Sequence, residues 1–241
     1  MNGFFCHKRV LIVFLKYLKS ELLVRTHKLF LTFIILLPFT VFSQVTFEVY
    51  FGTQYNVPTP LKIELNTPET IFVKNAKYDP DAFTGLNSPY YSWRLGFWNE
   101  NKAWELELVH EKIILINKPE NVQLFEISHG YNLVTLNRAL EKEYLIYRLG
   151  AGFVLAHPET KIYGKSMGNR GVEKEPPLGF SIAGPTLQGS LGTKQLHVFK
   201  GLFAVLETKV TMSYAIVKVA DGKAYVPNFA FHGLFGFGYE F

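Results

Sequence analysis

One segment of the chain gathers several side chains that could take part in nucleophilic catalysis. Residues 125–133 include a glutamate, a serine, a histidine, a tyrosine and an asparagine. A hydroxyl nucleophile needs a base within hydrogen-bond reach and a third group that orients the base. Ser128 and His129 are adjacent, however, and neighbouring side chains of a strand point to opposite faces of the sheet. A direct hydrogen bond between them would therefore require a β-bulge.

The remaining sequence offers few groups for metal or redox chemistry. Cys6 is the only cysteine, which excludes an internal disulfide and a zinc site built from cysteines. Five histidines follow residue 43, and none has the spacing of an HExxH motif. We therefore expect no metal site and no cofactor. We expect the imidazole of His232 to be a hydrogen-bonded structural group.

The elements that must position these residues are β-strands. Hydrophobic residues alternate with small or polar residues through most of the chain after residue 43, as in Phe47-Glu48-Val49-Tyr50-Phe51. This period of two is typical of strands with one apolar face, and no long stretch has the period of a helix. The opposite face carries Gly, Ser, Glu and Arg, which suits the crowded interior of a small barrel with lipid outside.

The leader is basic and apolar. Arg25 and Lys28 precede an apolar stretch at 29–42, followed by Ser43 and Gln44, which predicts a signal peptide cleaved after Ser43. A retained anchor helix is the alternative. Residues 1–23 carry a second, weaker apolar tract, so we expect the chain to be over-extended there, with translation starting near Val24.

The net charge depends on this leader. The whole chain has a formal charge of +5, with 25 basic and 20 acidic residues. Residues 1–43 hold six Lys or Arg and one Glu, which leaves 19 of each sign in the remainder. Nucleic-acid binding rests on a clustered positive surface, so we expect no nucleic-acid partner.

The C-terminal segment carries a family resemblance. In residues 229–241 aromatic residues occupy every second position except Gly233, and the chain ends on Phe241. Together with the leader, this ending resembles bacterial outer-membrane β-barrel proteins over residues 44–241. The resemblance implies a monomeric barrel in the Gram-negative outer membrane, surrounded by lipid and lipopolysaccharide. It also implies that the barrel-insertion machinery reads Phe237, Tyr239 and Phe241.

A shorter resemblance points to an enzyme. Residues 129–132 weakly resemble the His-x-Ser-Asn stretch of outer-membrane lipid A deacylases, in which a histidine and a serine attack an acyl ester of lipopolysaccharide. His129 and Asn132 match, and Glu143 lies at a comparable distance for the helping carboxylate. Tyr131 stands where the serine should be, and a phenol is a poor acyl nucleophile at neutral pH. The departure removes the central group of that chemistry.

Strand counting predicts an all-β, antiparallel transmembrane barrel. Ten alternating segments follow residue 43, and a single-chain barrel with both ends in the periplasm has an even number of strands. We therefore expect ten strands, or eight if the short segment at 59–66 merges into a neighbour. Ten strands would place residues 66–69, 99–102 and 192–195 at periplasmic turns, with the polar loop 158–178 outside the cell.

Inward positions predict a filled, charge-balanced interior. Five acids and five bases fall on the polar faces of the strands, without the surplus of one sign that lines a selective pore. Small barrels are filled by their own side chains. The residues expected inside are Lys62, Glu64, Lys74 and the members of a paired interior network, Arg94, Glu105, Glu107, Glu126, Arg148, Glu207 and Lys209.

The sequence thus favours a non-enzymatic outer-membrane protein with a structural or surface-interaction role. Two alternatives remain open. The first is a deacylase-like hydrolase with His129 as base and Glu143 as the orienting acid. The second is a small channel.

Overall fold

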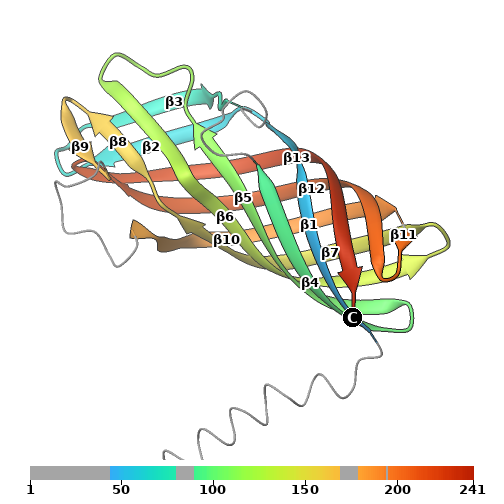
Figure 1. The fold of residues 1–241 in the computed structure, drawn as a ribbon. Helices are drawn as coiled ribbons and strands as arrows, with labels where there is room; N and C mark the ends of the chain where they lie inside the picture. The colour runs from blue at the N-terminus through green and yellow to red at the C-terminus, as the bar shows by residue number, and fades with distance from the viewer. Residues whose placement is uncertain (1–43, 80–89, 169–178, 194) are drawn as a thin grey trace, which may run out of the picture. The chain divides into compact units, whose positions relative to one another are not determined.

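The computed structural model describes residues 44–79, 90–168, 179–193 and 195–241 (Figure 1), without the side chains of Ser128 and His129. The predictions for the leader, the signal peptide and the translation start lie outside these residues. Within the described ranges, no helix is long and apolar enough to cross a membrane.

The described residues form thirteen strands, and every pairing between them is antiparallel. Their bounds are β1 Gln44–Asn56, β2 Thr59–Leu65, β3 Thr70–Ala76, β4 Tyr91–Asn99, β5 Lys102–Ile114, β6 Val122–Lys142, β7 Leu145–Ala156, β8 Glu159–Ile162, β9 Lys165–Met167, β10 Ser181–Thr193, β11 Leu196–Phe199, β12 Leu202–Val219 and β13 Gly222–Glu240.

Eight of the described strands close into a ring, which we call the lower tier. The order around it is β1, β4, β5, β6, β7, β10, β12 and β13, and β13 pairs back onto β1. The barrel prediction is confirmed with the alternative count of eight. The expected count of ten was wrong because 59–66 and 70–77 form a hairpin, β2–β3, that pairs onto β13 beyond the ring.

Four long strands continue past this ring into what we call the upper tier. These are β5, β6, β12 and β13, and β6 alone has 21 residues. In the upper tier β2 pairs with β13 and β3 with β2, while residues 77–79 pair with residues 114–116 beyond the end of β5. On the other side, β8 pairs with β6 and β9 with β8. The two hairpins thus take the places that β1, β4, β7 and β10 occupy in the lower tier.

The two ends of the molecule differ. Gln44 and Phe241 lie at the lower end with the tight β4–β5 and β6–β7 turns, while β2, β3, β8 and β9 lie at the opposite end (Figure 1). The turn at 99–102 lies at the end of the barrel that holds Gln44 and Phe241. The turn at 66–69 was expected at the same end as 99–102 but lies at the opposite end. It joins β2 to β3 in the upper tier and lies next to the β12–β13 turn.

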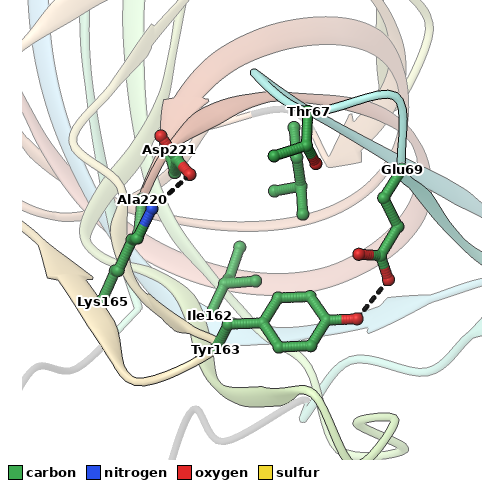
Figure 2. A pocket seen from close by; sticks show the side chains of 8 residues that line it. Thr67, Glu69, Ile162, Tyr163, Lys165, Ala220 and Asp221 are labelled. Carbon is green, nitrogen blue, oxygen red and sulfur yellow. Dashed lines mark hydrogen bonds and ion pairs between the residues drawn. The ribbon is translucent and has the colours of Figure 1, made fainter.

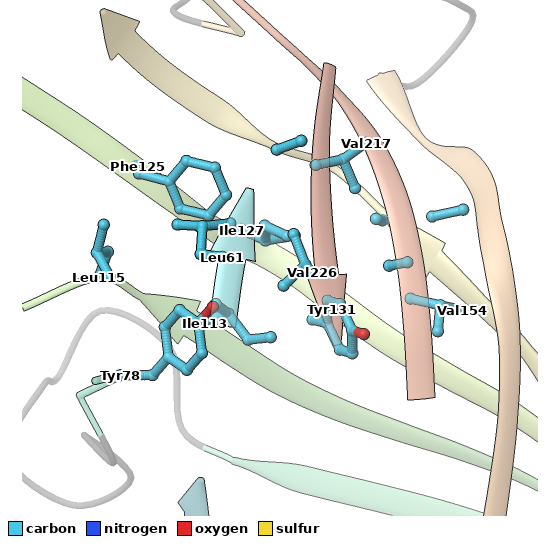
Figure 3. Packing of buried hydrophobic residues seen from close by; sticks show 14 of the residues in the cluster. Leu61, Tyr78, Ile113, Leu115, Phe125, Ile127, Tyr131, Val154, Val217 and Val226 are labelled. Carbon is cyan, nitrogen blue, oxygen red and sulfur yellow. The ribbon is translucent and has the colours of Figure 1, made fainter. Parts of the chain in front are cut away.

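The polarity of the wall reverses between the tiers. In the lower tier the outward side chains are apolar, such as Phe47, Phe51 and Leu206, while Glu48 and Glu207 are buried inside. In the upper tier the interior is apolar instead, and Figure 3 shows this packing. Its fully buried members include Leu61, Ile63, Ile113, Phe125, Ile127, Val217 and Val226. The lower tier is therefore built for lipid outside, and the upper tier for water.

Candidate functional site

The predicted interior network centres on Arg94 of β4, which is fully buried. Its Nη1 donates to Glu48 Oε2 at 3.0 Å and to the Tyr50 hydroxyl at 2.7 Å. Its Nη2 donates to Glu107 Oε1 at 3.0 Å and to Glu207 Oε1 at 2.8 Å. The Arg94 guanidinium also lies 4.7 Å from the centroid of the Tyr50 ring. One cation thus joins carboxylates from three other strands around the ring.

Two further cations complete this network. Arg148 of β7 donates from Nε to Glu105 Oε2 at 2.9 Å and from Nη1 to Glu207 Oε2 at 3.1 Å. Lys209 of β12 donates to Glu107 Oε1, and its Nζ lies 3.5 Å from Glu207 Oε1. Buried charges are tolerated where they are paired and hydrogen-bonded, as these three cations and their carboxylates are inside the lower tier.

The structure brings together six of the seven residues expected in the network. Glu126 lies outside it: Phe125 and Ile127 point inward, so Glu126 lies on the outer face of β6 and is only half-buried. Glu48 is a member that the sequence prediction missed, although it alternates between Phe47 and Val49. Asn137 and Gln188 also donate to Glu107 Oε2, at 2.9 and 2.7 Å.

The interior does not hold equal numbers of acidic and basic residues. Among the described residues, the fully buried acids are Glu48, Glu105, Glu107, Glu111 and Glu207, and the fully buried bases are Arg94, Arg148 and Lys209. The predicted five acids and five bases were wrong for two reasons. Lys62, Glu64 and Lys74 lie on the outer surface of the β2–β3 hairpin. Glu126 also lies outside, while Glu48 and Glu111 are buried and were not counted. In β2 and β3 most apolar side chains point inward and the charged side chains point outward, which is the opposite of the arrangement in the lower tier.

The residues of the hydrolase hypothesis do not meet. β6 and β7 pair without a break from Tyr131 to Lys142, which is about 36 Å of strand at roughly 3.3 Å per residue. Glu143 follows in the β6–β7 turn at the lower end, whereas His129 lies beyond the other end of this ladder. A carboxylate at Glu143 therefore cannot orient the imidazole of His129. Tyr131, at the serine's place, points inward and hydrogen-bonds with the Ser213 hydroxyl at 2.8 Å.

A bulge does interrupt β6 at this histidine. Glu111 pairs with Tyr131 and Ile113 with Ile127, so one residue of β5 opposes three of β6. The side chains of Ser128 and His129 lie outside the described part. Asn132, the other matching residue, faces outward, and its Oδ1 lies 2.7 Å from His110 Nδ1.

Two other predicted groups can be placed. His232 is buried between the Tyr90 hydroxyl at Nδ1 and the Thr211 hydroxyl at Nε2, both at 2.9 Å. The three C-terminal aromatic residues alternate on the outer face of the last strand and its end, namely Phe237, Tyr239 and Phe241. Within the described ranges, no group of three or more His, Cys, Asp or Glu is arranged to hold a metal ion.

A pocket at the top of the upper tier is the candidate ligand site. It has a volume of about 220 Å³ and lies between the β2–β3, β8–β9 and β12–β13 turns (Figure 2). Polar groups come from all three turns, and the apolar part is formed by Leu65, Ile162 and Ala220. We refer to it as the tip pocket. The polar lining residues are Thr67, Glu69, Tyr163, Lys165 and Asp221.

Contacts between turns hold the tip pocket in shape. Lys165 Nζ donates to Asp221 Oδ2 at 2.6 Å, and the Tyr163 hydroxyl donates to Glu69 Oε1 (Figure 2). Hydrogen bonds from Lys165 and Asn66 lower the pKa of Asp221. Because this folded-state pKa is depressed, the Asp221 contacts are fully present above the ordinary carboxyl pKa and are lost only as the pH falls through the lowered value.

The β8–β9 turn explains how Tyr163 reaches its position. Tyr163 and Gly164 both have positive φ, at 49° and 75°, as the two central residues of a type I′ hairpin turn require. This tight hairpin occupies the first part of the segment 158–178, for which the sequence predicts a polar loop. None of the tip-pocket residues was predicted as a site.

Comparisons with known proteins concern the fold alone. No protein-family model matches the sequence, and no curated protein matches it. Among solved structures, the chain is similar to Neisserial surface protein A (NspA), with a TM-score of 0.40, 10% identity and coverage of 82% of this chain and 97% of that chain. It is also similar to Ail, the attachment invasion locus protein of Yersinia pestis, with a TM-score of 0.38, 11% identity and coverage of 81% and 98%.

A third similar structure is the outer membrane protein AlkL in lipid bilayers, with a TM-score of 0.46, 12% identity and coverage of 82% and 90%. The fold class of this chain follows from its own geometry rather than from these similarities. That geometry is a closed antiparallel ring with an apolar outer wall, a charged interior and an aromatic C-terminal strand. The described residues after position 43 therefore form an eight-stranded β-barrel of the outer-membrane type.

Proposed function

We propose that this protein is a non-enzymatic, surface-interaction protein of the Gram-negative outer membrane. The lower tier anchors the chain in lipid, and the upper tier presents the tip pocket to the medium. The observation that carries the proposal is the reversal of polarity along the long strands. Apolar side chains face outward in the lower tier and inward in the upper tier, so the upper tier is a folded body that projects beyond the bilayer.

The same geometry favours this role over the two alternatives. The Arg94 network occupies the lower tier and the apolar cluster occupies the upper tier, which gives no support to a conducting pore. The separation of His129 from Glu143 along β6 gives no support to a deacylase-like hydrolase.

We also propose how the protein is exported and inserted into the outer membrane. Export would use the leader at residues 1–43, and the insertion machinery would read Phe237, Tyr239 and Phe241, which are accessible on the outer face. The eight strands of the ring close within one chain, and among the described strands next to the lower tier only the short β11 has an edge without a partner strand, which supports a monomer.

Surface labelling of intact cells tests the orientation and the exposure of the tip pocket. In a Cys6→Ser background, Tyr163→Cys is expected to react with a membrane-impermeant maleimide on intact cells, because its ring is half exposed at the top of the upper tier. Tyr144→Cys is the matched control, since it replaces an exposed tyrosine in the β6–β7 turn at the lower end. It should react only after the outer membrane is permeabilised. Equal labelling of both variants on intact cells, or the reverse order, would contradict the proposal.

A further inference from the structure

The outer wall of the upper tier carries a patch of lysines just above the apolar belt. Lys218 of β12 pairs directly with Lys223 of β13, Lys223 pairs with Glu64 of β2, and Tyr225 pairs with Lys62. All three lysines are exposed. Within the described part of the chain, the patch therefore places two ammonium groups on one carboxylate, with Lys218 on the neighbouring strand beside Lys223.

Glu64 holds two of these lysines close to each other. Lys62 Nζ lies 2.6 Å from Glu64 Oε1, and Lys223 Nζ lies 3.2 Å from Glu64 Oε2. The Tyr225 hydroxyl donates to Glu64 Oε2 at 2.9 Å. Hydrogen bonds from Lys62, Tyr225 and Lys223 lower the pKa of Glu64 to about 2, so it is ionised at neutral pH. The patch keeps a surplus of two positive charges.

An apolar groove lies below Lys218 and Lys223, on β12, β13 and the neighbouring β10. It has a volume of about 320 Å³ and lies between β10, β12 and β13. Its outward lining is Pro185, Leu187, Met212, Tyr214 and Pro227. Two prolines contribute no backbone donor to the ladder, and β10 shifts register between Ile182 and Gly184, so the wall is interrupted here.

The groove and the lysine patch follow one another along the β12–β13 strand pair. Tyr214 pairs with Pro227, four residues below the pair formed by Lys218 and Lys223. Four residues of a strand tilted at 35–45° rise by about 10 Å. This is the separation of a headgroup anion from the upper part of an acyl chain in one lipid molecule. With the groove at the upper edge of the hydrocarbon layer, the lysines would stand at the height of the lipid headgroups.

We propose that the lysine patch and the groove together bind an acylated phosphoglycolipid of the outer leaflet. Lys62, Lys218 and Lys223 hold a phosphate group, and one acyl chain lies in the groove between β10 and β12. The proposal rests on the proposed membrane location. Glu64 competes with the phosphate for Lys62 and Lys223.

Lipid binding by purified barrel in detergent micelles tests this site. The probes are bisphosphorylated lipid A, dephosphorylated lipid A and inorganic phosphate. The double variant Lys218→Gln/Lys223→Gln is expected to bind bisphosphorylated lipid A about tenfold more weakly, because each lysine near the membrane surface attracts an anionic lipid. Lys77→Gln/Lys161→Gln, which removes two exposed lysines elsewhere in the upper tier, is the matched control and should bind as the parent does. Glu64→Gln should bind more tightly.

Three outcomes would overturn the lipid site. They are equal affinity for the dephosphorylated lipid, an unchanged affinity of the Lys218/Lys223 variant, and competition by inorganic phosphate that matches competition by the whole lipid. The third outcome would mean that the groove contributes nothing. Each is distinguishable from failure of the proposed function, because the labelling of Tyr163→Cys on intact cells is measured independently of lipid binding.

Discussion

Arg94→Gln is expected to lower the free energy of unfolding of the barrel by about 3–5 kcal/mol, the cost of leaving buried charges without their partner. The guanidinium of Arg94 is the common partner of Glu48, Glu107 and Glu207, and all three carboxylates are buried. The measurement is urea unfolding in detergent micelles, followed by the difference in electrophoretic mobility between heated and unheated samples.

Arg138→Gln is the matched control for this change. Arg138 lies on β6 but points outward, with its guanidinium 5.2 Å from the centroid of the Trp104 ring. Its loss removes one cation–π contact at an exposed site, which is worth about 0.5–1 kcal/mol. If Arg94→Gln were no more destabilising than Arg138→Gln, the buried network would not be what holds the lower tier together.

Gly236→Leu is expected to destabilise the barrel by about 1–3 kcal/mol, the usual cost of overpacking a filled interior. Gly236 points inward on β13, and a Cβ atom built there would lie 2.5 Å from Tyr50 Cδ1 and 2.9 Å from the Val49 carbonyl oxygen. The Tyr50 ring cannot move aside easily, because its hydroxyl hydrogen-bonds with Arg94 and Glu48. Unfolding in urea measures the effect.

Gly233→Leu provides the control on the same strand. Gly233 points outward, and a Cβ atom there would have nothing within 4 Å. It is also the one gap in the aromatic row of the last strand, so a leucine should be neutral or slightly stabilising in lipid. Comparable losses in the two glycine variants would mean that the alternation along β13 does not separate an inner face from an outer one.

The lower tier could largely be predicted from the sequence. Alternation in β1, β4, β5 and β12 is local, and it assigns Arg94, Glu107 and Lys209 to one face without knowledge of the partners. The alternation alone does not show whether the apolar face of a strand contacts lipid on the outside or packs in an interior core. In β2 the same alternation puts Leu61 and Ile63 inside and Lys62 outside, because this hairpin stands in water rather than lipid. This reversal explains the error in strand number and the two bases wrongly placed in the interior, whereas the errors at Glu48, Glu111 and Glu126 are separate.

The tip pocket could not be predicted from sequence patterns. Its polar groups come from turns around residues 67, 163 and 221, which alternation does not connect. The β8–β9 and β12–β13 turns carry local signals, since Gly164 allows the positive φ that a type I′ turn needs and Asp221-Gly222 is a common hairpin pair, but these signals do not show that the turns meet. The lysine patch depends likewise on the register of β2 against β13.

Spin labels along the outer face of β12 test the reversal of polarity between the tiers most directly. Single cysteines would replace Leu206, Val210, Tyr214 and Lys218 in a Cys6→Ser background, and the protein would be reconstituted in lipid bilayers. All four side chains point outward on one strand. Collision with oxygen should be most frequent at Leu206 and Val210, and collision with a water-soluble nickel chelate should rise sharply at Lys218. Nickel accessibility that is equally high at all four positions would contradict a lipid-immersed lower tier.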